Sequence, residues 1–274
     1  MKIVNDGDLV QVSRDSIKSV GQKTLELLSG NSIQVDAIIF ATGWQSSSCP
    51  LFSPAMRAEI GLPVPLGYLS DEEAGYWREL DKVAEKEVLD LYPYLLHRPK
   101  DIITRNIHDT PFRLLRTIIP PKLASQHDRS IAFLSQPINT QNTFFAEISG
   151  LWTIAYLEGL LSDNDLIENK DAMDHEIALM LAFMKWRYPG RNNVPIAGLE
   201  IRHWMDKMLS DLGVRTDRNR LHWERTHPNE WDWWGWKAWI YEWFLPYEPE
   251  VYKGIVQEFL DRVGENNTEL KKTK

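Results

Sequence analysis

Cysteine is almost absent from this chain of 274 residues, which contains only Cys49. An internal disulfide is therefore excluded, and this mildly favours a reducing compartment. No apolar run is long enough to cross a bilayer as a helix. The first ten residues are interrupted by Asn5, Asp6 and Asp8, so they do not resemble a signal or transit peptide. We expect a cytoplasmic protein with no membrane span.

Excess positive charge is also lacking, because the formal net charge is −8. An acidic chain repels phosphate backbones, so we expect no nucleic-acid partner. Recognisable catalytic and metal motifs are missing too. His222 and His227 lie near acidic residues, but no zinc spacing such as H-E-x-x-H occurs, so we predict no metal site. Cys49 is interpreted as a plain loop thiol, because no base or orienting group is indicated for it.

A glycine-rich phosphate-binding turn is the most informative absence. The chain has 15 glycines, yet none of them fall into the spacing G-x-G-x-x-G. In proteins with that turn, backbone amides at a helix N-terminus bind the pyrophosphate of a dinucleotide. This chain therefore offers no such cradle of its own.

Short strands are predicted in the N-terminal part of the sequence. Lys23–Leu28 precedes a Ser-Gly-Asn sequence at residues 29–31, which indicates a hairpin turn. The run Ala37–Ala41 is apolar without polar alternation, which is typical of a strand covered on both faces. It ends at Thr42-Gly43, where a residue without Cβ lets a ligand or another backbone approach closely. A second buried strand is predicted at Ile131–Leu134.

Helices are predicted from periodic apolar residues and from their caps. Ser70 and Glu73 have capping-box spacing before a helix that Pro93 stops, whereas the proline-containing segment 46–69 is predicted to be an irregular loop. A buried helix is expected from about residue 144 to Gly159. From about residue 171 the chain is expected to be helical. Its three apolar stripes begin at Met173, Ile201 and Val251, and the last is expected to end at Gly264.

Several of these segments, taken in order, resemble flavin-containing monooxygenases. Asp36 and the following Ala41-Thr42-Gly43-Trp44 look like the "ATG" motif of FAD/NAD(P)-dependent oxidoreductases, and the preceding hairpin has the expected place. Ile131–Leu134 and the helix after it are similar to the end of the FAD domain in the fungal branch of that family. The later segments also resemble the C-terminal extension of the fungal proteins: Trp186–Tyr188, Asp211–Gly213, Phe244–Tyr247 and Tyr252–Gly254.

The resemblance implies an α/β fold. Residues 1–165 would be the remainder of a Rossmann-like FAD/NAD(P)-binding domain, and residues 166–274 a helical, Trp-rich C-terminal extension. It implies FAD and NADPH as cofactors, with Ala41, Thr42, Gly43 and Trp44 beside the flavin. In such an enzyme the cofactor supplies the chemistry and the protein binds, orients and excludes water, so we assign no catalytic side chain. The implied function is oxygenation of a small hydrophobic metabolite, in fungal secondary metabolism.

The missing glycine-rich turns leave other functions open. The chain could be a non-catalytic, truncated homologue, or a subunit that associates with a partner chain carrying the N-terminal FAD-binding portion. A tryptophan-lined carrier of apolar ligands is a weaker alternative. Most of the 12 tryptophans lie late in the chain, and we favour a core that locks the tail helices over an exposed binding surface.

A basic stretch inside the acidic chain allows three interpretations. It could meet the 2′-phosphate of NADPH, the acidic surface of the portion that this chain lacks, or only solvent. Its members are Arg98, Lys100, Arg105, Arg113, Arg116 and Lys122.

Overall fold

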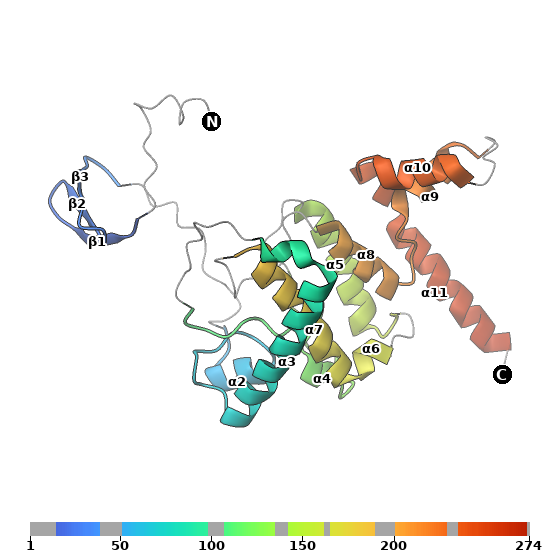
Figure 1. The fold of residues 1–274 in the computed structure, drawn as a ribbon. Coiled ribbons are helices and arrows are strands. Elements are labelled where there is room, and N and C mark those ends of the chain that lie inside the picture. Colours follow the sequence, from blue (N-terminus) through green and yellow to red (C-terminus); the bar gives the residue numbers. More distant parts are fainter. Residues whose placement is uncertain are drawn as a thin grey trace. The chain divides into compact units, whose positions relative to one another are not determined.

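The computed structural model describes residues 15–38, 51–97, 107–134, 142–161, 165–189, 201–228 and 235–272. Contacts divide the chain into two compact units, Met1–Ser46 and Ser47–Lys274, each of which is considered by itself (Figure 1). The division predicted between residues 165 and 166 is not tested by this partition and stays a prediction. Across the described residues, no helix combines the length and apolarity needed to cross a membrane.

The first unit contains a small antiparallel sheet with strand order β1-β2-β3. Its strands are β1 (Ile17–Val20), β2 (Thr24–Leu27) and β3 (Ser32–Gln34). Gly30 has a φ of +88° in the turn between β2 and β3, a conformation that glycine adopts without steric cost. Its amide donates to the Leu27 carbonyl at 3.0 Å, so the predicted hairpin is confirmed.

The predicted buried strand after this hairpin is only partly described. Ala37 and Ile38, its first two residues, belong to no strand, and Ala37 is exposed. The remainder of the predicted strand, and with it Ala41, Thr42, Gly43 and Trp44, lies outside the described residues. A mixed fold with a small sheet is thus observed, while the Rossmann-like arrangement stays a prediction.

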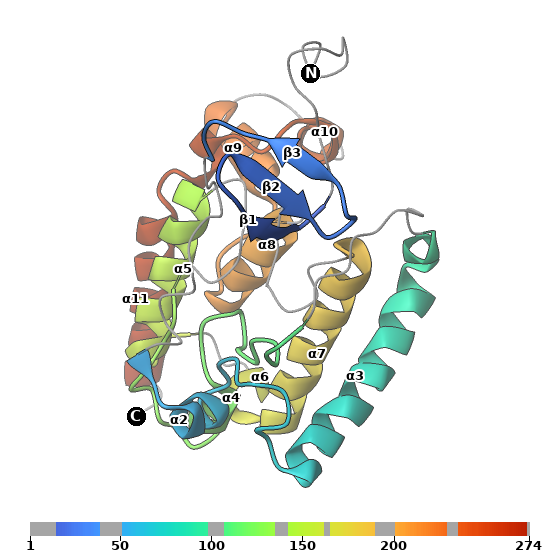
Figure 2. The ribbon, with the colours of Figure 1, turned by 90° about the vertical axis from the view of Figure 1, so that its left-hand side faces the viewer.

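The second unit is helical. Its α-helices are α2 (Pro54–Glu59), α3 (Asp71–Leu91), α4 (Pro121–Ala124), α5 (Asn142–Leu157), α6 (Asp165–Glu168), α7 (Lys170–Arg187), α8 (Ile201–Asp211), α9 (Arg218–Thr226), α10 (Trp236–Phe244) and α11 (Ile255–Lys272). Two 3₁₀ helices accompany them, η2 (Pro93–Leu96) and η4 (Pro249–Tyr252). The main core is formed by α5, α7, α8 and the start of α11, which lie side by side in Figure 2. A second, smaller core lies between α3 and α7.

Local sequence explains where several helices begin and end. The Ser70 hydroxyl accepts from the Glu73 amide at 3.2 Å, so the predicted cap of α3 is confirmed. Asn169 caps α7 in the same way, through the Ala172 amide at 3.1 Å. Gly213, with a φ of +68°, follows the end of α8 as predicted, since a left-handed residue closes the last turn.

Three predictions about secondary structure were wrong. The proline-containing segment holds α2, because Ser53 accepts from the Met56 amide at 3.3 Å and a proline fits the first helical turn. Ile131–Leu134 is not a strand, although the Phe133 amide donates to the Ile118 carbonyl at 2.8 Å. Gly264 lies inside α11 and does not end it, since an interior glycine costs only about 1 kcal/mol.

Candidate functional site

A cavity of about 520 Å³ opens between α3, α7 and α8. Methionine, aromatic and branched side chains line most of it, and a few polar groups lie at one end. This combination is typical of a small-molecule site. The main lining residues are Val88, Leu91, Leu115, Ile177, Met180, Phe183, Met184 and Trp204, together with the polar Tyr92, Arg116, Glu176, His203 and Lys207.

A network of charges forms the polar end of the cavity. The buried guanidinium of Arg116 makes a two-pronged ion pair with Asp211, with N···O distances of 2.8 and 3.1 Å. It also donates to Glu176, which accepts from Lys207 on the same carboxylate oxygen, Oε1. The indole of Trp152 donates to Asp211 at 2.9 Å. Two cations and two carboxylates therefore balance one another.

Burial and charge act in opposite directions on these groups. Burial alone would raise the pKa of Glu176, but the positive charges of Arg116 and Lys207 outweigh it and lower that pKa below its ordinary value. Burial would likewise lower the pKa of Arg116, but Asp211 and Glu176 raise it. Both shifts favour the charged forms of Glu176 and Arg116.

The turn that carries Arg116 has an uncommon backbone. Arg116 and Thr117 have φ values of 53° and 61°, and the Ile118 amide donates to the Leu115 carbonyl at 2.9 Å. These are the features of a type I′ turn, which asparagine and glycine usually occupy. A β-branched residue such as Thr117 is strained there. The surrounding core holds the turn in place and so fixes the guanidinium at the cavity.

The three described members of the basic stretch lie in different environments. Arg113 pairs with Asp81 at 2.7 Å and lies over the Trp77 ring at 4.1 Å. Lys122 pairs with Glu59 at 3.0 Å on the surface, and Arg116 is buried as described above. Arg113 and Arg116 therefore do not belong to a solvated face, whereas Lys122 lies on the surface. Contacts of the stretch with the NADPH phosphate or with an acidic surface stay predictions. Arg98, Lys100 and Arg105 lie outside the described residues.

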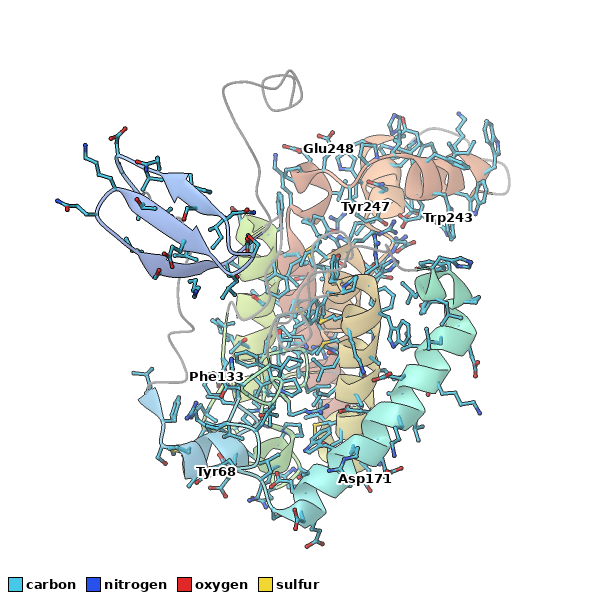
Figure 3. All side chains as sticks on the ribbon, turned by 60° about the vertical axis from the view of Figure 1, so that its left-hand side comes forward. Tyr68, Phe133, Asp171, Trp243, Tyr247 and Glu248 are labelled. Carbon is cyan, nitrogen blue, oxygen red and sulfur yellow. The ribbon has the colours of Figure 1, made fainter. Side chains whose placement is uncertain are left out.

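The late tryptophans divide into two groups. Trp223 is buried and stacks on His227, with ring centroids 5.2 Å apart. In contrast, Trp236, Trp239 and Trp243 of α10 are 54%, 53% and 70% exposed (Trp243 is labelled in Figure 3). The prediction that these tryptophans form a core that locks the tail helices is thus wrong for α10. Trp231, Trp233 and Trp234 lie outside the described residues.

A second polar cluster lies between α8, α10 and η4. Arg202 pairs with Glu242 at 2.8 Å and lies over the Tyr247 ring at 3.7 Å. Burial, opposed by the positive charge of Arg202, raises the pKa of Asp206 to about 6. Burial also raises the pKa of Tyr252, whose hydroxyl has no hydrogen-bond partner within the described part of the chain. This cluster joins α8 to the chain that follows α10.

No grouping of three potential metal ligands occurs among the described residues. His227 contacts Trp223 and Tyr241 and no metal-type cluster. Cys49 lies outside the described part of the chain.

Comparison with known proteins identifies the class of sequences to which this chain is similar. The chain is a homologue of fungal FAD-dependent monooxygenases, since relatives with that name match 79–97% of it at 25–29% identity. The resemblance predicted from residues 36–44 and the later segments is thereby confirmed. No protein-family profile matches the chain, and no solved structure is significantly similar to it.

Three of these relatives illustrate the match. FAD-dependent monooxygenase resA of Aspergillus sclerotiorum is 27% identical over 259 residues, which cover 94% of this chain and 41% of resA. An FAD-dependent monooxygenase of Pyrenophora dematioidea is 29% identical, with 79% and 39% covered. FAD-dependent monooxygenase DEP4 of Fusarium langsethiae is 28% identical, with 91% and 40% covered. The chain therefore spans 39–41% of the length of these relatives.

Proposed function

We propose that this chain forms part of an FAD-dependent monooxygenase that oxygenates a small hydrophobic metabolite in fungal secondary metabolism. The observation that carries the proposal is similarity to proteins of that name over most of the chain. The cavity between α3, α7 and α8 supports an apolar substrate, because its walls are mainly methionine, aromatic and aliphatic. The proposed cell compartment is the cytoplasm.

The proposed flavin contacts are Ala41, Thr42, Gly43 and Trp44, within a Rossmann-like remainder at residues 1–165. The helical extension at 166–274 would complete the enzyme, and NADPH would be the reductant. The sequence contains no G-x-G-x-x-G turn, the motif whose backbone amides bind a dinucleotide pyrophosphate. The contacts to the FAD pyrophosphate would therefore come from another portion of the enzyme.

Flavin uptake tests whether the chain is an enzyme on its own. The purified protein is incubated with FAD, separated from free flavin by gel filtration, and assayed for flavin absorbance and NADPH oxidation. Gly43→Val should reduce uptake, since added bulk blocks close approach at that turn. Gly75→Val is the matched control, because a Cβ at Gly75 on α3 meets no atom within 4 Å. Absence of uptake by the parent protein would overturn autonomous catalysis.

A second candidate function is a subunit or non-catalytic homologue that associates with a chain carrying the FAD-binding portion. The exposed aromatic face of α10 favours this candidate: Trp236, Trp239, Trp243 and Phe244 are each more than half exposed. Contiguous aromatic surface of this kind is uncommon on monomeric proteins and marks interaction sites.

Sedimentation distinguishes the two functions. The chain is mixed with the portion of resA that it does not match, and complex formation is measured by analytical ultracentrifugation. The double variant Trp239→Ser/Trp243→Ser should weaken the complex. Tyr94→Ser/Leu96→Ser on η2 serves as the control, since these exposed side chains lie away from α10 in sequence. Equal loss of binding in both variants, or no complex with the parent chain, would contradict a docking role for α10.

A further inference from the structure

We propose that the cavity between α3, α7 and α8 binds a neutral, mainly apolar molecule that carries one carbonyl or hydroxyl oxygen. This inference deepens the proposed function, because such a molecule would be the substrate. The residues that would hold this ligand all belong to this chain, and they require no flavin.

The apolar part of the cavity selects for a hydrophobic body. Met180 and Met184 of α7 and Phe183 between them line it, and Trp204 of α8 lies opposite on the other helix. Met180 is only partly buried, so part of its apolar surface faces the open volume. A volume of about 520 Å³ lies in the range of sites for small molecules, which runs from about 300 to 1,000 Å³.

The polar end retains hydrogen-bonding capacity. An arginine has five N–H groups, and Arg116 uses three of them on Asp211 and Glu176. Glu176 receives both cations on Oε1, and among the described residues no donor lies on its Oε2. A ligand carbonyl can accept from the guanidinium, and a ligand hydroxyl can donate to Oε2.

The charges at this end select against an ionised ligand. Arg116 and Lys207 are balanced by Glu176 and Asp211, so a carboxylate would lose its hydration without gaining an unpaired cation. A neutral oxygen pays a much smaller desolvation cost and can still hydrogen-bond. The cavity should therefore prefer an alcohol or ketone to a carboxylate of the same chain length.

Displacement of a neutral fluorescent dye tests this preference. Nile red is titrated into the full chain at pH 8, where imidazoles are ordinarily neutral, and is then displaced by 1-decanol, 2-decanone or decanoate. The alcohol and the ketone should displace the dye at concentrations about tenfold lower than decanoate, which corresponds to about 1.4 kcal/mol of binding free energy. Equal displacement by all three, or no dye binding, would overturn the proposal.

Filling the cavity locates the binding. Met180→Trp places a larger ring in the open volume and should reduce dye affinity about tenfold. Met56→Trp on α2 is the matched control, because Met56 is 48% exposed and does not line this cavity. Circular dichroism checks that both variants remain folded. Equal affinity in the two variants would place the dye elsewhere and overturn the assignment.

A change of charge should abolish the preference for the alcohol over the carboxylate. Glu176→Gln preserves shape but leaves the polar end with one excess positive charge, carried by Arg116 and Lys207. Decanoate should then bind about tenfold more tightly than to the parent, while the alcohol changes little. Unchanged ligand ranking in this variant would show that the network does not face the ligand.

These measurements can fail separately from the proposed function. If the chain binds the dye with the expected ranking of ligands but takes up no flavin, the ligand site is supported and autonomous catalysis is ruled out. If the chain takes up flavin but shows no preference among the three ligands, the monooxygenase assignment is supported and this ligand site is ruled out.

Discussion

Tryptophans in the helical core and on α10 have opposite environments, although they belong to the same chain. Trp152 and Trp204 are 0% and 8% exposed, whereas Trp243 is 70% exposed. The reason lies in the helix faces: α10 buries the small Ala238 and leaves its tryptophans on the other side. Aromatic content alone therefore does not indicate a core, because a side chain is buried only if it lies on the helix face that packs against a neighbouring helix.

Replacing one tryptophan in the helical core and one on α10 should give the largest difference in unfolding free energy. Trp152→Ala deletes a ring that stacks on Tyr156 and an indole that donates to Asp211, so we expect a loss of about 3–5 kcal/mol in unfolding free energy. Trp243→Ala should change it by less than about 0.5 kcal/mol. Urea denaturation followed by circular dichroism measures both. Similar losses in the two variants would contradict the contrast.

The polar cluster between α8, α10 and η4 should make the stability of the protein depend on pH. Burial raises the pKa of Asp206 to about 6, above its value of about 3.9 in an unfolded chain. The folded state therefore binds the proton more tightly, and this contribution to stability is complete below about pH 3.9 and is lost as pH rises through 6.

Asp206→Asn should remove this loss. The parent should lose more stability than the variant between pH 5 and pH 7.5, as measured by thermal unfolding at both pH values. Asp261→Asn, at an exposed position on α11, is the control and should follow the parent. A parent and an Asp206 variant with the same pH dependence would show that Asp206 ionises normally.

The smallest difference in stability between paired variants is expected for two buried threonines. Thr117→Gly loses a buried side chain but relieves a left-handed conformation that costs about 1–2 kcal/mol, so stability should change by less than about 1 kcal/mol. Thr153→Gly in α5 relieves nothing, adds the helix penalty of glycine and should cost about 2 kcal/mol. Denaturation midpoints compare the two. A larger loss at Thr117 would show that its turn is not strained.

Local signals made some elements predictable from sequence. Ser70 marked the start of α3, and Gly30 marked the hairpin, because each contacts backbone within a few residues. Ser53 followed by Pro54 is likewise a local signal for a helix start, at α2. It was missed because the other prolines nearby indicated a loop. Ile131–Leu134 had the composition of a strand, yet composition does not supply a neighbouring strand to pair with.

The cavity and its network could not be predicted in this way. Arg116 reads as one more cation in a basic stretch, and its burial depends on Asp211, which lies 95 residues later. The exposure of Trp239 and Trp243 depends on which face α10 turns toward α9, and sequence spacing alone does not determine this. Ala41, Thr42, Gly43 and Trp44 remain predicted flavin contacts that the described residues do not test.

The separation between Arg116 and its acceptors has a consequence for synthesis of the chain. At about 5–20 residues per second, a ribosome adds Asp211 several seconds after Arg116, since 95 residues separate them. Throughout that interval the guanidinium lacks Asp211, and it also lacks Glu176 until 60 residues have been added. The apolar faces of α5 and α7 lack α8 until the end of the interval. The nascent protein should therefore depend on chaperones until residue 211 has left the ribosome, and products that stop earlier should aggregate.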